Sequence, residues 1–115
     1  MIRHAIAALT ALALSFTAAH AQVNRNTTNS SSTITLGNTF QTISAAQPRF
    51  TITIQNNNTN GDNCWLFIGG GSATKGTSIL LAPGGSYQRY YPYVPSDAIQ
   101  MTCATTSDTF YLDTQ

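Results

Sequence analysis

The chain has 115 residues, with five Lys or Arg, four Asp or Glu and two His, so its formal net charge is +1. Charged residues make up only 8% of it. A chain so close to neutrality lacks the electrostatic attraction that binding to phosphate backbones or anionic lipid requires. Neither nucleic acid nor a membrane surface is therefore expected as a partner.

Residues 1–21 have the layout of a secretory signal peptide. Arg3 gives a basic start, residues 5–19 form an alanine-rich apolar run, and Ala19-His20-Ala21 is a small-residue cleavage pattern. The apolar run is shorter than the ~20 residues that span a bilayer, so membrane insertion is not expected. Cleavage before Gln22 leaves 94 of the 115 residues, with four basic and four acidic side chains and a net charge of zero. The sequence predicts a secreted or periplasmic bacterial protein.

Two cysteines, Cys64 and Cys103, follow the export signal. In an oxidising compartment they are expected to form one disulfide bond. Closing a loop of this length contributes about 4 kcal/mol to stability in the chain-entropy model. The exported chain then has no free thiol, no histidine and no glutamate.

Catalysis is not expected from the groups that remain. A nucleophile and its base would have to come from Ser or Thr with Lys75, or from two converging aspartates. The four aspartates are isolated in the sequence, at Asp62, Asp97, Asp108 and Asp113. The prediction is that the protein is not an enzyme.

After the signal, residues 22–32 (QVNRNTTNSSS) have almost no apolar side chains and are predicted to form a flexible arm, or alternatively an edge strand or an assembly tether. Residues 33–115 are predicted to form one domain, without an apolar period long enough for a helix. Strands are expected at Thr33–Leu36, Phe40–Ile43, Phe50–Gln55, Cys64–Ile68, Thr77–Leu81, Ser86–Tyr91, Ala98–Ala104 and Thr109–Asp113. Seven or eight short strands predict an all-β fold, a single antiparallel β-sandwich of Ig-like or jelly-roll-like type.

Strand alternation predicts which side chains face the core. The expected inward positions are Phe50, Ile52, Ile54, Cys64, Leu66, Ile68, Ile99, Met101 and Cys103. Both cysteines therefore fall on inner faces, where a disulfide can lie in the core. The same alternation sends Trp65 and Phe67 outward, where they form either a second packed layer or an exposed aromatic patch.

The tyrosine-rich segment 84–95 is the main candidate for a binding site. Alternation places Tyr87, Arg89 and Tyr91 on one face, so the guanidinium can stack on the flanking rings. Pro92 and Pro95 favour an edge or an exposed extended segment. Flat aromatic rings beside amides suit a saccharide or a peptide. The candidate binding residues are Tyr87, Arg89, Tyr91, Tyr93, Trp65 and Phe67; alternatively, the tyrosines only cover the edge of the sandwich.

The asparagine-rich run at residues 56–61 places oxygen-bearing side chains before a glycine, as a calcium loop does. Its only acid is Asp62, however, and Phe67 occupies the position where a calcium loop needs a bidentate Glu. The Asn60-Gly61 dipeptide is typical of a turn instead. No metal and no other cofactor are expected.

Three segments of the chain look familiar: Ser78–Tyr87 with its Pro83-Gly84-Gly85 turn, Pro92–Ile99, and Asp108–Asp113. Through these three segments, residues 47–115 resemble a group of small, uncharacterised exported proteins of proteobacteria. They are also similar to the β-sandwich accessory domains of phage virions. The resemblance implies a β-sandwich and transfers no catalytic residues. The export signal departs from the phage pattern, so the resemblance implies the fold rather than a virion role.

These features predict a non-catalytic exported binding or attachment module, with a carbohydrate or a cell-surface polymer as the partner of the aromatic edge. The alternative is a structural subunit of an extracellular or virion-like assembly. In that case the low charge and strong β-propensity would serve self-association through strand edges.

Overall fold

The computed structural model describes residues 26–115, so the predicted signal peptide lies outside the described residues. The described part is built almost entirely of short strands. These are β1 (Thr28–Asn29), β2 (Ser32–Thr33), β3 (Gln41–Ser44), β4 (Thr51–Asn56), β5 (Cys64–Ile68), β6 (Ile79–Leu81), β7 (Ser86–Tyr90), β8 (Ile99–Cys103) and β9 (Thr109–Thr114). A single 3₁₀ turn, η1 (Lys75–Thr77), lies between β5 and β6.

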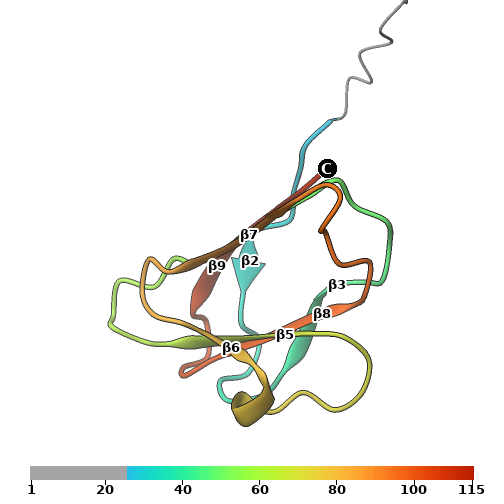
Figure 1. Ribbon diagram of the computed structural model, residues 1–115. Helices are drawn as coiled ribbons and strands as arrows, with labels where there is room; N and C mark the ends of the chain where they lie inside the picture. Colours follow the sequence, from blue (N-terminus) through green and yellow to red (C-terminus); the bar gives the residue numbers. More distant parts are fainter. Residues whose placement is uncertain (1–25) are drawn as a thin grey trace, which may run out of the picture.

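The strands form two antiparallel sheets that pack face to face (Figure 1). In the first sheet, sheet A, the order is β1-β9-β4-β7, and β2 also pairs with β9. In the second, sheet B, the order is β3-β8-β5-β6. The predicted all-β sandwich is confirmed. Nowhere in residues 26–115 is a helix long and apolar enough to cross a membrane.

The core lies between the sheets and follows the alternation of the strands. In β4 the isoleucines are fully buried and the threonines are only half-buried, which is the pattern of a strand with one face on the core. The buried apolar residues form one cluster: Ile34, Ile52, Ile54, Cys64, Leu66, Leu81, Ile99, Met101, Cys103, Phe110 and Leu112.

The disulfide bond joins Cys64 to Cys103, and both residues are fully buried. The two cysteines lie directly opposite each other in the register of β5 and β8, which are neighbours in sheet B. The predicted bond and the inward direction of both side chains are confirmed. The bond ties two strands of one sheet rather than one sheet to the other, and an oxidised bond fits an extracellular or periplasmic location.

The structure differs from the sequence prediction at the N-terminal end of the domain. A strand was expected at Thr33–Leu36, but β2 ends at Thr33 and the chain turns at residues 35–39. The reason is that Asn38 has a positive φ of 59° and donates its backbone N–H to Cys103 O, which ends the extended run.

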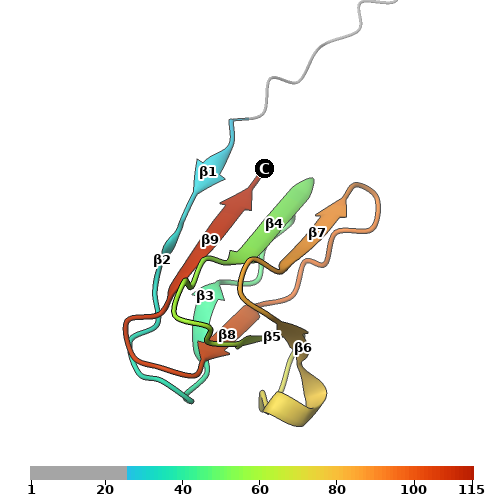
Figure 2. The same ribbon diagram turned by 90° about the vertical axis from the view of Figure 1, so that its left-hand side faces the viewer.

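Part of the predicted arm forms β1 and the start of β2, both paired with β9 (Figure 2). Ser30 N also donates to Leu112 O at 2.8 Å. These strands expose their side chains, so backbone hydrogen bonds rather than apolar burial hold them. The arrangement corresponds to the edge-strand alternative for this segment.

Candidate functional site

Four large aromatic side chains gather where β4 begins and β7 ends. Phe50 precedes β4, Tyr90 ends β7, and Tyr91 and Tyr93 lie in the turn that follows. Their exposed fractions are 36%, 60%, 69% and 82%, respectively. We call these four residues the aromatic cluster. It lies at the same end of sheet A as the C-terminus (Figure 2).

Backbone hydrogen bonds hold the cluster in shape. Tyr91 N donates to Phe50 O at 2.8 Å, and the two rings stack with centroids 5.3 Å apart and planes inclined by 26°. Tyr93 N donates to Tyr90 O at 3.0 Å, which closes a turn around the cis Tyr91–Pro92 peptide bond. Three of the rings are therefore carried by a closed turn, and the fourth belongs to Phe50, the residue directly before the neighbouring strand β4.

Arg49 anchors the loop that follows this turn. Its side chain is only 6% exposed, and Nη1 donates to Pro95 O at 2.9 Å and to Asp97 O at 3.0 Å. From the other nitrogen, Nη2, it donates to Ser44 Oγ at 2.7 Å and to Ala45 O at 2.6 Å. One guanidinium thus joins residues 44–45 to residues 95–97, next to Phe50 in the sequence.

The environment of Arg49 is unusual for a cation because its four hydrogen-bond acceptors are neutral oxygens. Burial lowers the pKa of Arg49 from its ordinary value, and the charge of the Asp97 carboxylate partly opposes this shift. An arginine pKa is so high that the side chain stays charged, and its five N–H donors make it suited to bridge several carbonyl groups.

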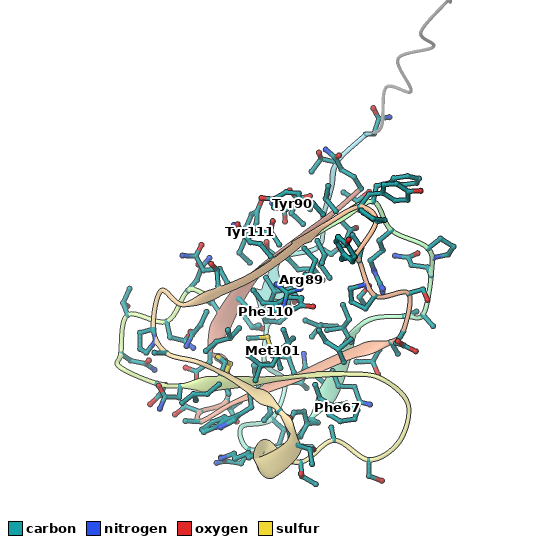
Figure 3. All side chains as sticks on the ribbon, in the orientation of Figure 1. Phe67, Arg89, Tyr90, Met101, Phe110 and Tyr111 are labelled. Carbon is teal, nitrogen blue, oxygen red and sulfur yellow. A yellow bond between two sulfur atoms is a disulfide. The ribbon has the colours of Figure 1, made fainter. Side chains whose placement is uncertain are left out.

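Tyr87 and Arg89 share one face of β7, as predicted, but this face looks into the sandwich. Arg89 lies opposite the buried Ile52, and Tyr87 lies opposite the buried Ile54. The guanidinium carbon of Arg89 lies 4.6 Å from the centroid of the Tyr87 ring. Figure 3 shows Arg89 between the two sheets and Tyr90 above sheet A. Tyr91 lies beyond the end of the strand and stacks on Phe50 instead.

Trp65 and Phe67 alternate with the buried Cys64 and Leu66 and so lie on the outer face of sheet B, in the other layer of the sandwich. Figure 3 shows Phe67 on this face. Both are half-buried, and the ammonium group of Lys75 lies 3.9 Å above the Trp65 ring. The same ammonium group donates to Asn38 Oδ1 at 2.6 Å. η1 thus covers part of this face. Because Trp65 and Phe67 lie on sheet B and the aromatic cluster lies at the end of sheet A, these residues do not form one surface with the cluster.

The outer face of sheet A is polar and leads away from the cluster. Tyr90 lies opposite Thr51 in the register, and Tyr111 lies opposite Gln55 further along β4. Tyr111 Oη donates to Asp113 Oδ2 at 3.4 Å. Partial burial, the charge of Asp113 and this hydrogen bond raise the pKa of Tyr111 from its ordinary value.

The asparagine-rich loop at the other end of β4 brings two of the four aspartates together. The Asn60 side-chain amide donates to Asp62 Oδ2 at 2.9 Å and to Asp108 Oδ1 at 3.0 Å. Both carboxylates also accept bonds from Thr105, through its hydroxyl for Asp62 and its backbone N–H for Asp108. These contacts close turns. Within the described range, no group of three or more His, Cys, Asp or Glu side chains is placed to hold a metal ion.

The sequence analysis missed two members of the aromatic cluster. It placed Phe50 in the core because Phe50 alternates with Ile52 and Ile54, but β4 begins one residue later and Phe50 is partly exposed. It omitted Tyr90 because alternation sends Tyr90 to the face opposite Tyr87 and Arg89. The available signal was the position of both residues at strand ends, where alternation no longer predicts burial.

Comparisons with protein-family models, with curated proteins and with solved structures find no match for this chain.

Proposed function

We propose that the protein is a non-catalytic binding module that attaches to a neutral glycan or a similar uncharged cell-surface polymer through the aromatic cluster. The observation that supports this most directly is the stacked pair of Phe50 and Tyr91, which stays exposed together with Tyr90 and Tyr93. Exposed large aromatic residues in one contiguous patch are rare unless they serve an interaction.

The chemistry of the cluster favours an uncharged ligand. Tyrosine rings offer flat apolar faces to the C–H groups of a sugar ring, and their hydroxyl groups can exchange hydrogen bonds with sugar hydroxyls. The chain that follows the predicted signal peptide has a net charge of zero, so long-range charge attraction adds little to binding.

The location outside the cytoplasm is part of the same proposal. The disulfide bond supports it, because such bonds persist in oxidising compartments. The absence of catalysis is supported by the engagement of Asp62 and Asp108 in turn hydrogen bonds.

The test is a pull-down with insoluble polysaccharides, followed by titration calorimetry with soluble oligosaccharides of those that bind. Replacing both Tyr91 and Tyr93 by alanine should weaken binding at least about tenfold, the equivalent of ~1.4 kcal/mol, because each ring loses its stacking contact. Leu80→Ala is the matched control, because Leu80 is 55% exposed but lies on β6 in sheet B.

Two results would contradict the proposal. One is that the wild-type protein binds none of the polymers. The other is that the Tyr91→Ala, Tyr93→Ala double variant binds as tightly as wild type while its melting temperature shows that it is folded.

The alternative function, a structural subunit that assembles through strand edges, needs an edge that is open to pairing. At β7, the edge next to the aromatic cluster, two outward backbone carbonyl groups already accept hydrogen bonds, which disfavours such pairing.

A further inference from the structure

Strand β7 lies at the edge of sheet A. Among the described strands it pairs with β4 alone. Tyr91 N donates to Phe50 O and Asn56 N donates to Gly85 O, so the odd-numbered residues of this segment direct their backbone groups at β4. In an antiparallel pair the direction alternates along the strand. Ser86, Gln88 and Tyr90 therefore direct their backbone groups away from β4, to the outside of the sheet.

Two of these three outward carbonyl groups already accept hydrogen bonds. Gln88 O accepts from Arg89 Nη1 at 2.9 Å. Tyr90 O accepts from Tyr93 N at 3.0 Å, within the turn that carries the aromatic cluster. A strand that added to β7 would have to displace the first bond and compete with the second.

Arg89 also places a positive charge where an added strand would bury it. The residue faces inward, opposite Ile52, and remains exposed only because β7 is the last strand of sheet A. Its guanidinium lies over the Tyr87 ring. A neighbouring strand would remove water from this charge, and burial of a cation without a partner is strongly unfavourable. Inward-pointing charges on edge strands are a known means of preventing edge-to-edge association.

We propose that Arg89 closes the β7 edge against pairing with a second copy of the chain, and that this edge becomes a dimer interface when the charge is removed. The most symmetric pairing places Gln88 opposite Gln88 of the second copy. In it, the backbone N–H of each Gln88 would donate to the Gln88 carbonyl oxygen of the other copy, the oxygen that now accepts from Arg89. It also places Arg89 opposite Tyr87 of the second copy. This inference is independent of the ligand proposed above, and its consequence is that the neighbouring aromatic cluster stays accessible.

The experiment is sedimentation velocity over a range of concentrations, with amide hydrogen exchange measured on the same samples. The variant Arg89→Thr removes the charge and supplies a residue with high β-propensity at an exposed position. We expect its apparent dimer dissociation constant to be at least roughly tenfold lower than that of wild type. We also expect the Gln88 amide to gain exchange protection as the concentration rises. Arg89→Lys keeps an inward charge and should behave as wild type does.

Lys75→Thr is the matched control. It also removes one exposed cation that lies over an aromatic ring, but on sheet B rather than at the β7 edge. It should leave the association state unchanged, which separates edge pairing from a general loss of charge.

The proposal is overturned if Arg89→Thr and a second variant, Arg89→Val, are folded by circular dichroism and associate no more than wild type does. It is also overturned if Arg89→Thr associates while the Gln88 amide exchanges as freely as in the monomer, since the contact then lies elsewhere. Concentration-dependent protection of Gln88 in the wild-type protein would overturn it as well, because the edge would then be open with Arg89 in place.

Discussion

Arg49 is the residue on which the loops beside the aromatic cluster depend. Replacing it by methionine keeps most of the apolar stem but removes four hydrogen bonds to Ser44, Ala45, Pro95 and Asp97. We expect Arg49→Met to lower the free energy of unfolding by about 3 kcal/mol, since four partly buried hydrogen bonds from a charged, buried guanidinium are lost. Urea denaturation followed by circular dichroism measures this change.

A second arginine of the same chain gives the control for this prediction. Arg89 is exposed, and among residues 26–115 its side chain donates to one carbonyl group, that of Gln88. At a protein concentration low enough to keep the variant monomeric, Arg89→Met should change the free energy of unfolding by less than about 1 kcal/mol. If Arg49→Met were as stable as Arg89→Met, the hydrogen bonds of Arg49 would not be holding the loops.

The role of Arg49 is not visible in the sequence, whereas that of the cysteines is. Cys64 and Cys103 each share a strand face with the aliphatic side chains, which alternate with aromatic ones in β5 and with polar ones in β8, so the direction of both cysteines follows from parity. Arg49 lies between a proline and a strand, and its acceptors at Pro95 and Asp97 are 46 and 48 residues away along the chain. A contact of that separation depends on how the strands pair, which local sequence pattern does not specify.

At the scale of elements, the turn between β2 and β3 fits tightly against the turn between β8 and β9. A Cβ atom built on Gly37 would lie 2.8 Å from Thr106 N and 2.9 Å from Ala104 O, both backbone atoms. Gly37→Ala should therefore destabilise the protein by about 1–3 kcal/mol, because one of the two turns must shift. Thermal and urea unfolding measure this effect.

Gly70 offers a matched control for the same substitution. A Cβ atom there would have nothing within 4 Å, and its φ is not in the left-handed region. Gly70→Ala should stay within about 0.5 kcal/mol of wild type. Equal stability of the two alanine variants would show that the two turns move apart freely.

The strands themselves were largely predictable, but their partners were not. β4, β5, β8 and β9 coincide closely with the expected ranges, because β4, β8 and β9 alternate buried apolar residues with other side chains and β5 is a short apolar run between turn residues. The alternation of residues within a strand does not predict which strand it pairs with, so the pairing of β7 with β4 rather than with β6, its neighbour in sequence, could not be predicted. That pairing brings Tyr91 onto Phe50 and so creates the aromatic cluster, which explains why the predicted site contained only part of it.

At the scale of the whole molecule, the two ends of the sandwich have different roles. The end with the asparagine-rich loop is closed by hydrogen bonds among Asn60, Asp62, Thr105 and Asp108. The end with the C-terminus carries the exposed rings, three of them on a turn that is followed by the loop anchored by Arg49. Hydrogen bonds therefore close one end, while the other exposes aromatic surface, where the proposed ligand would bind.

The disulfide bond should determine whether this small domain is stable as a whole. It closes a loop between residues that are 39 positions apart and contributes mainly by restricting the unfolded chain. Replacing both Cys64 and Cys103 by alanine should lower the free energy of unfolding by about 4 kcal/mol, a large share of the 5–15 kcal/mol typical of a domain. The circular dichroism spectrum at low temperature should stay unchanged, because the strands that pair around the bond remain paired.

Urea denaturation of wild type with and without reductant, and of the double variant, measures the change in the free energy of unfolding. Reductant should destabilise wild type and leave the double variant unaffected. A wild-type midpoint that did not move on complete reduction would mean that the packing of β5 against β8 alone sustains the fold.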